Sequence, residues 1–238
     1  MKNEIAILMA AGMGSRMLPL TKSTPKPLIK VFGKSMIETI IDSLEEYGIK
    51  HIYVVVGYKK EQFEFLSTKY SNVTLIENKE YTIKNNISSI FAVSDILGKE
   101  NCFICESDLY IADSSIFDVN LTQSCYYGKM VQGWSDDWGF ELDKDGRIIS
   151  VRKGVESSYN MVGISYFTAE DAKRLSRAIK STCTQDGHEN LFWDEVVDKE
   201  LKNINLLIHP INENQIYELD SVSDLKNLDE NYQEYNKS

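Results

Sequence analysis

A loop near the start of the chain combines glycines with basic side chains, a combination that can bind phosphate groups. Gly12 and Gly14 let the backbone approach a ligand closely, and consecutive amide N–H groups there can hold phosphate oxygens. Arg16 can bind a phosphate through two parallel hydrogen bonds. Lys26 adds a compact positive charge between two prolines. A glycine pair alone is often only a turn, but this combination indicates a phosphate-binding site.

Two familiar nucleotide-binding signatures do not occur in this loop. The sequence lacks the spacing G-x-x-x-x-G-K-[ST] of P-loop enzymes, and it lacks the third glycine of the dinucleotide motif G-x-G-x-x-G. Kinases and dehydrogenases are therefore disfavoured.

Two aspartates are candidates for holding a metal ion beside the phosphorylated ligand. Asp108 follows the apolar stretch 101–105, and Asp220 follows a second apolar stretch late in the chain. Ligands of parallel sheets sit beyond the carboxyl ends of the strands, and Mg²⁺ prefers a few carboxylates together with substrate phosphates. On the residues alone, Asp108 and Asp220 are candidates for binding Mg²⁺, but a helix cap is the commoner role of aspartates at such positions.

Strands and helices alternate in the part of the chain that carries these residues. Apolar runs predict strands at 5–9, 51–56, 73–76 and 101–105, and helical spacing predicts helices at 36–44, 63–70 and 85–97. This alternation implies right-handed crossovers and an α/β fold with a mostly parallel sheet flanked by helices. From 124 to 167 several short strands follow without long helices, which predicts a small antiparallel insertion or lid. Further helices are expected at 169–180 and 191–201, and a final strand at 206–208 leads to the stretch 216–220 and then a short helix.

The composition indicates an acidic globular protein. Hydrophobic residues make up 42% of the 238 residues, and the formal net charge is −10, which disfavours nucleic acid as a partner. No apolar run approaches the roughly 18 residues of a membrane span, and the start of the chain does not resemble a signal peptide, so we expect a cytoplasmic protein without a membrane partner. Cys102 and Cys105 lie in a predicted strand and are expected to be buried thiols rather than a zinc or redox pair. The oligomeric state is not readable from these patterns.

The glycine motif is longer than its two glycines. It reads Ala10-Ala11-Gly12-Met13-Gly14-Ser15-Arg16, followed by Pro19-Leu20-Thr21 and Pro25-Lys26-Pro27-Leu28. This stretch resembles the signature of the nucleotidyltransferases that make sugar nucleotides and related activated compounds. Over nearly its whole length the chain resembles the bacterial choline-phosphate cytidylyltransferases of the licC type, with supporting segments at 56–63, 85–89, 192–194 and 216–222.

The resemblance implies a Rossmann-like fold in one domain, 1–238, with a nucleotide-binding half at 1–120 and an acceptor-binding half at 121–238. It implies that an acceptor phosphate oxygen attacks the α-phosphorus of CTP while pyrophosphate leaves, with Mg²⁺ bound by Asp108 and Asp220 as cofactor. Arg16 and Lys26 would be the catalytic residues. Arg16 would hold the β- and γ-phosphates, and Lys26 would stabilise charge near the α-phosphate. The nucleotide would be bound by Leu8, Ala10, Ala11, Gly12, Gly14, Asn85, Asn86, Ser88 and Ser89.

The acceptor would be phosphocholine on this resemblance. A quaternary ammonium has no hydrogen to donate, so proteins bind it with aromatic faces and nearby carboxylates. The candidate acceptor-binding residues are Trp138, Phe192, Trp193, Asp194, Tyr217 and Glu218. The family pattern has Asp and Tyr where this chain has Asn190 and Phe192.

The residues leave two other hypotheses open. The same chemistry could act on aminoethylphosphonate, another amino-alcohol phosphate or a sugar 1-phosphate; a primary ammonium favours carboxylates over aromatic rings, and a sugar favours Asn, Gln and Glu. The chain could also be an inactive nucleotide-binding module, but Arg16, Lys26, Asp108 and Asp220 are all present, which speaks against that function.

Overall fold

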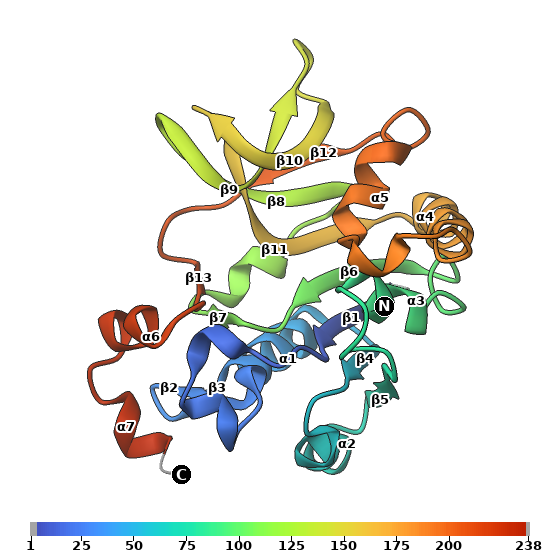
Figure 1. The fold of residues 1–238 in the computed structure, drawn as a ribbon. Helices are drawn as coiled ribbons and strands as arrows, with labels where there is room; N and C mark the ends of the chain where they lie inside the picture. The colour runs from blue at the N-terminus through green and yellow to red at the C-terminus, as the bar shows by residue number, and fades with distance from the viewer. Residues whose placement is uncertain (1–3, 237–238) are drawn as a thin grey trace.

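The computed structural model describes residues 4–236 and is built around one large sheet (Figure 1). The strands are β1 (Glu4–Ala10), β2 (Lys30–Val31), β3 (Lys34–Ser35), β4 (His51–Val56), β5 (Val73–Glu77), β6 (Asn101–Glu106), β7 (Leu109–Ile111), β8 (Cys125–Met130), β9 (Trp134–Leu142), β10 (Ile148–Glu156), β11 (Tyr159–Phe167), β12 (Leu207–Pro210) and β13 (Ile216–Glu218). The helices are α1 (Met36–Tyr47), α2 (Glu64–Lys69), α3 (Ile87–Ala92), α4 (Ala169–Thr182), α5 (Trp193–Glu200), α6 (Val222–Leu228) and α7 (Tyr232–Tyr235).

The sheet mixes parallel and antiparallel strands. Its order is β10-β9-β11-β6-β1-β4-β5, with β8 beside β11 and β12 beside β8. Strands β6, β1, β4 and β5 run parallel, and β11 pairs with β6 in the antiparallel direction. This arrangement confirms the predicted α/β class with a mixed sheet flanked by helices.

Strand β1 shows how the two faces of the sheet are covered. Ala6 and Leu8 point into a core that includes the apolar faces of α1 and α2. Ile5 and Ile7 point into a second core, which receives α3, α4 and α5. Since successive side chains of a strand point to opposite faces, a run of apolar residues is what a strand buried on both sides requires.

The strands between 124 and 167 belong to the same sheet as the parallel strands. Strand β11 pairs with β6 from Ile164 opposite Cys105 to Phe167 opposite Cys102, so the antiparallel part continues the sheet on the β6 side. The hairpin of β9 and β10 forms the edge beyond β11. The division into nucleotide-binding and acceptor-binding halves stays a prediction, because this pairing shows only that the two halves share one sheet.

The predicted helix at 85–97 is shorter in the structure, where α3 ends at Ala92. Turns follow it, yet Val93 and Leu97 remain buried. The apolar spacing therefore predicted correctly that these two side chains are buried, although the helix ends before them. By contrast, α1 ends where predicted, with Gly48 in the left-handed region at φ 93°.

Two expectations from composition can be compared with the structure. Cys102 and Cys105 are free and fully buried, as predicted for strand residues. Across residues 4–236, none of the helices has the length and apolar character that crossing a membrane requires.

Phe103 in β6 offers a test of the core. Its side chain is 0% exposed and meets the rings of Tyr47, Phe117 and Tyr166 at centroid distances of 5.7, 5.3 and 5.0 Å. Phe103→Ala should lower the free energy of unfolding by about 3–5 kcal/mol, because it leaves a cavity among these rings. Urea-induced unfolding measures the change. The control Phe65→Ala removes a ring that is 42% exposed and should cost less than about 1 kcal/mol; equal losses would contradict this description of the core.

Candidate active site

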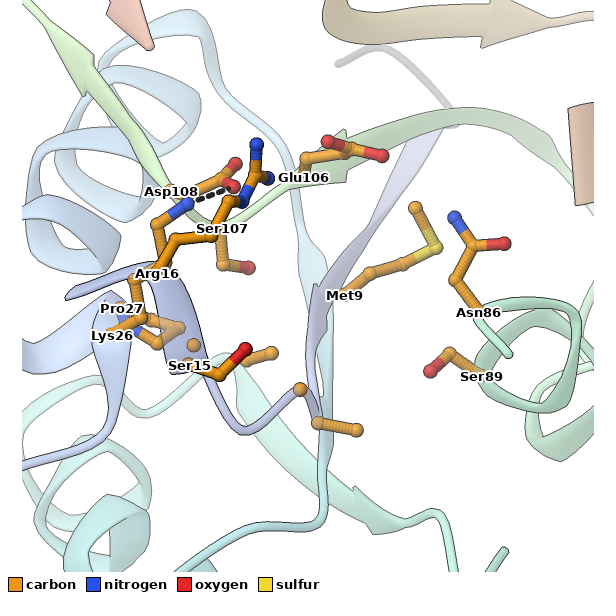
Figure 2. Close-up of a pocket in the computed structure, with 14 residues that line it drawn as sticks. Met9, Ser15, Arg16, Lys26, Pro27, Asn86, Ser89, Glu106, Ser107 and Asp108 are labelled. Carbon is orange, nitrogen blue, oxygen red and sulfur yellow. Dashed lines mark hydrogen bonds and ion pairs between the residues drawn. The ribbon is translucent and has the colours of Figure 1, made fainter. Parts of the chain in front are cut away.

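A cavity of about 300 Å³ opens at the carboxyl ends of β1 and β6, the edge at which ligands of parallel sheets bind (Figure 2). Its lining consists of Met9, Ala10, Ala11, Gly12, Gly14, Ser15, Arg16, Lys26, Pro27, Asn86, Ser89, Glu106, Ser107 and Asp108. In Figure 2, Arg16, Lys26 and Asp108 lie on one wall, and Asn86 and Ser89 lie on the wall across from them. The cavity thus has a charged wall and a neutral polar wall.

Gly14 is required by the packing of this loop. Its φ is +61°, and a Cβ at this position would lie 2.7 Å from Cβ of Lys26. The Thr21 hydroxyl donates to the Gly14 carbonyl at 3.0 Å and holds the turn in place. Gly14 therefore allows Lys26 to pass directly behind the loop. Gly12 has open space around it, which leaves room for a ligand.

Lys26 forms the centre of the charged wall. Its Nζ lies 2.7 Å from Oδ2 of Asp108 and 2.8 Å from Oδ1 of Asp220, and the residue is only 7% exposed. Arg16 Nη1 contacts the other oxygen of Asp220 at 2.6 Å. Burial by itself lowers the pKa of Lys26, but the charges and hydrogen bonds of Asp108 and Asp220 outweigh it, and the pKa is raised. Lys26 is therefore a firmly charged group.

The pairing of two short strands brings the aspartates together. Asp108 lies between β6 and β7, and Asp220 follows β13. Strand β13 pairs with β7, with Glu218 opposite Leu109, and the Leu219 amide donates to the Asp108 carbonyl at 3.1 Å. Neither aspartate is a helix cap, because Ser221 caps α6 and Asp113 caps the short 3-10 helix Ser114–Phe117.

Further carboxylates crowd the same place. Carboxylate oxygens of Glu106, Asp108 and Glu218 all lie within 4.8 Å of one another. Desolvation and then the charge of Asp108 raise the pKa of Glu106 well above its usual value, and desolvation followed by Asp108 and Asp220 raises the pKa of Glu218 to about 8. Oδ1 of Asp108 is buried without a hydrogen-bond partner among the described residues. Oxygen ligands with uncompensated negative charge fit a hard divalent cation such as Mg²⁺.

A second cavity, of about 570 Å³, adjoins the first and shares Arg16 and Glu106 with it. Its lining is rich in carboxylates and also includes basic, aromatic and small side chains: Arg16, Glu106, Asp136, Asp137, Trp138, Lys153, Met161, Gly163, Phe192, Asp194, Glu218, Asp220 and Asp224. Trp138 and Phe192 form an edge-to-face pair at 5.5 Å between ring centroids. The two cavities together have room for a nucleotide and a small second substrate.

The structure brings most of the predicted nucleotide-binding residues to the first cavity. Asn86 and Ser89 line it, whereas Leu8 is buried in the core. Ser88 points away and donates to the Asn85 carbonyl at 2.8 Å. The side-chain Nδ2 of Asn85 donates to the carbonyl of Asn190 at 3.2 Å, so Asn85 and Ser88 support the wall rather than line it.

The predicted acceptor-binding residues divide in the same way. Trp138, Phe192, Asp194 and Glu218 line the second cavity. Trp193, which is 3% exposed, instead stacks on Tyr126 in the core at 6.1 Å. Tyr217 packs against the apolar cluster around Met17 and Leu225. The structure therefore does not bring Trp193 and Tyr217 to this cavity.

Some cavity residues were not among the sequence candidates. Glu106 could have been found, because it directly ends the strand that leads to Asp108. The local sequence gives no such indication for three others, because the pairing of β9 with β10 is what brings them to the cavity: Asp136, Asp137 and Lys153.

A basic glycine loop at the edge of a parallel sheet, facing clustered carboxylates, is the arrangement of an enzyme that transfers nucleotidyl groups. The family model described as nucleotidyl transferase matches residues 5–126, and the chain belongs to this family. It is thus a nucleotidyltransferase.

Individual relatives cover nearly the whole chain. A 2-aminoethylphosphonate cytidylyltransferase of Lancefieldella rimae is 52% identical over 227 residues, which cover 95% of this chain and 92% of that protein. A choline-phosphate cytidylyltransferase of Streptococcus pneumoniae is 32% identical over 225 residues, with 94% of this chain and 96% of that protein covered. The solved structure of the CTP:phosphocholine cytidylyltransferase LicC of S. pneumoniae matches with a TM-score of 0.88 at 31% identity, covering 96% of this chain and 98% of that chain. The resemblance inferred from the motifs is confirmed.

Asp194 provides a test of the electrostatics of the site. It is 3% exposed and accepts a hydrogen bond from Tyr126 Oη at 2.9 Å, and burial raises its pKa to about 7. In the unfolded chain the pKa of this carboxyl is near its ordinary value of 3.8, so between the two pKa values the folded protein binds a proton that the unfolded chain releases. The stabilisation of the fold by this bound proton is complete below the pKa of the unfolded chain and is lost as the pH rises through the folded pKa of about 7. Asp194→Asn should therefore raise Tm relative to the parent protein more at pH 8 than at pH 5.

Thermal unfolding of both proteins at the two pH values measures this difference, and the other titrating groups cancel in the comparison. The control Asp145→Asn lies in an exposed turn and should shift Tm equally at both pH values. A pH-independent gain for Asp194→Asn would show that this carboxyl is not desolvated.

Proposed function

We propose that this nucleotidyltransferase transfers CMP from CTP to 2-aminoethylphosphonate and releases pyrophosphate, with Mg²⁺ as cofactor. A phosphonate oxygen forms the new bond to the α-phosphorus of CTP as the bond to the pyrophosphate oxygen breaks. The nucleotide occupies the first cavity and the acceptor the second, so that the phosphonate group lies near their shared residues, Arg16 and Glu106.

The acidic lining of the second cavity is the observation that carries the choice of acceptor. A primary ammonium has three N–H donors and binds best to carboxylates. Asp194 and Glu218 face this cavity with raised pKa values, each caused first by desolvation, so a bound ammonium would favour their ionised forms. The 52% identity to a 2-aminoethylphosphonate cytidylyltransferase supports the same choice.

Positioning and charge neutralisation account for the proposed catalysis. Lys26 lies next to the glycine loop and carries a firm charge, which suits it to stabilise negative charge at the α-phosphate. Arg16 is 69% exposed at its side chain and can reach the outer phosphates without breaking core contacts. Asp108, Asp220 and the nearby Glu106 would hold the Mg²⁺ ion. When bound, that ion would neutralise phosphate charge and help to orient the phosphates.

Phosphocholine is the second candidate acceptor, and the aromatic pair of Trp138 and Phe192 favours it. The similarity to the choline-phosphate cytidylyltransferase of S. pneumoniae supports it as well, at lower identity. The sequence alone favoured phosphocholine; the carboxylate-rich cavity and the 52% identical relative favour the aminoethylphosphonate alternative.

Pyrophosphate release tests the acceptor directly. With CTP and Mg²⁺, we expect kcat/KM to be highest for 2-aminoethylphosphonate among a panel that also contains phosphoethanolamine, phosphocholine and glucose 1-phosphate. The N–H donors of a primary ammonium can pair with carboxylates, which favours 2-aminoethylphosphonate and phosphoethanolamine over the other two acceptors, and the 52% identical relative is the reason to place the phosphonate first. A higher kcat/KM for phosphocholine would overturn this assignment and leave the nucleotide side of the site intact.

Replacement of Lys26 tests the nucleotide side. Lys26→Met should lower kcat by about 10²–10³-fold at saturating substrates, as expected for the loss of one preorganised charge at the reacting phosphate. The control Lys22→Met removes an exposed charge from the same loop and should keep kcat within about threefold. Thermal unfolding confirms that both variants are folded. A folded Lys26→Met variant with near-normal kcat would contradict the role of this lysine.

A further inference from the structure

The aromatic pair of the acceptor cavity already holds a cation from the protein itself. Nζ of Lys153 lies 5.9 Å from the ring centroid of Trp138 and 5.8 Å from that of Phe192. Both distances are within the range over which an ammonium is attracted to the face of an aromatic ring. Trp138 and Phe192 are thus not free aromatic faces in this structure.

The sheet places Lys153 beside these rings. In the register of β9 with β10, Lys153 is directly opposite Trp138, so the two side chains project from the same face of the sheet. The register shifts immediately after Lys153, at Gly154, whose φ is +77°. The pairing resumes with Val155 opposite Ser135, so a local irregularity of the ladder lies directly beside the lysine that lines the cavity. Phe192 directly precedes α5, and its ring packs edge-to-face against Trp138.

This arrangement affects two kinds of acceptor differently. A trimethylammonium group can bind only by contact with ring faces and by charge, and here the faces are shared with a resident ammonium of like charge. A primary ammonium can instead donate hydrogen bonds to the carboxylates of Asp194 and Glu218, which do not depend on the rings.

We propose that Lys153 is a specificity-determining residue, which occupies the Trp138–Phe192 pair with its own ammonium and thereby selects acceptors with a primary ammonium over acceptors with a quaternary one. This inference rests on the proposed function, since it explains how the same cavity rejects phosphocholine. The occupied pair also explains why aromatic residues can be present at the acceptor site without making it a choline site.

The test compares kcat/KM for phosphocholine and for 2-aminoethylphosphonate in the parent enzyme and in Lys153→Met. The neutral variant should raise the ratio of phosphocholine to 2-aminoethylphosphonate by about tenfold, chiefly through a lower KM for phosphocholine, because the ring faces become available. Lys153→Arg keeps a cation on the rings and should keep the parent ratio. Lys144→Met removes a charge from the exposed turn of the same hairpin and should change neither substrate.

Two further variants make the outcome decisive. Lys153→Gln must shift the ratio in the same direction as Lys153→Met, which guards against a folding defect of one variant. Adding Trp138→Leu to Lys153→Met should remove the gain for phosphocholine, because the new binding surface is the exposed ring. If the parent enzyme prefers 2-aminoethylphosphonate and both neutral variants keep its ratio of kcat/KM values, the role of Lys153 is overturned and the proposed function is not. A parent enzyme that prefers phosphocholine would overturn the proposed function itself.

Discussion

The contact of the Lys26 ammonium with the carboxylates of Asp108 and Asp220 is the interaction on which the site depends. A nearly buried ammonium needs compensating charge, and here the two partners come from the end of β6 and from the segment after β13. The interaction therefore ties the first loop of the chain to its last part. It also explains Gly14, because only a residue without Cβ lets Lys26 pass so close behind the loop.

The rest of the site contains more carboxylates than basic groups to pair with them. Glu106 and Glu218 join the two aspartates, and the raised pKa values of Glu106 and Glu218 follow from desolvation and from this crowding. A site of this kind is prepared for cations that arrive with the substrates. On the proposed function these are Mg²⁺ on the nucleotide side and an ammonium on the acceptor side, so one electrostatic feature serves both substrates.

Local patterns were sufficient to predict much of the fold. The β-branched run His51–Val56 forms β4 with the same bounds, and helix α1 ends at Gly48 as its apolar spacing and cap predict. The loop after β1 was also recognisable, because glycines and basic residues at close spacing have a direct physical use. The end of α3 at Ala92 was not predictable, since buried residues continue the helical spacing through the turns that follow.

The residues of the second cavity show which features local patterns do not predict. Trp193 and Asp194 are neighbours in the chain, yet the indole packs in the core while the carboxylate reaches the cavity, because consecutive helical residues point in different directions. Lys153 reaches Trp138 only through the register of β9 with β10. Residue types and spacing were thus enough to indicate a phosphate-binding loop and candidate metal-binding aspartates after predicted strands, while the nucleotidyl-transfer chemistry came from the resemblance of the motifs to a known family. The lining of the second cavity follows from strand register and helix orientation, which are set by pairing and packing between segments distant in the chain.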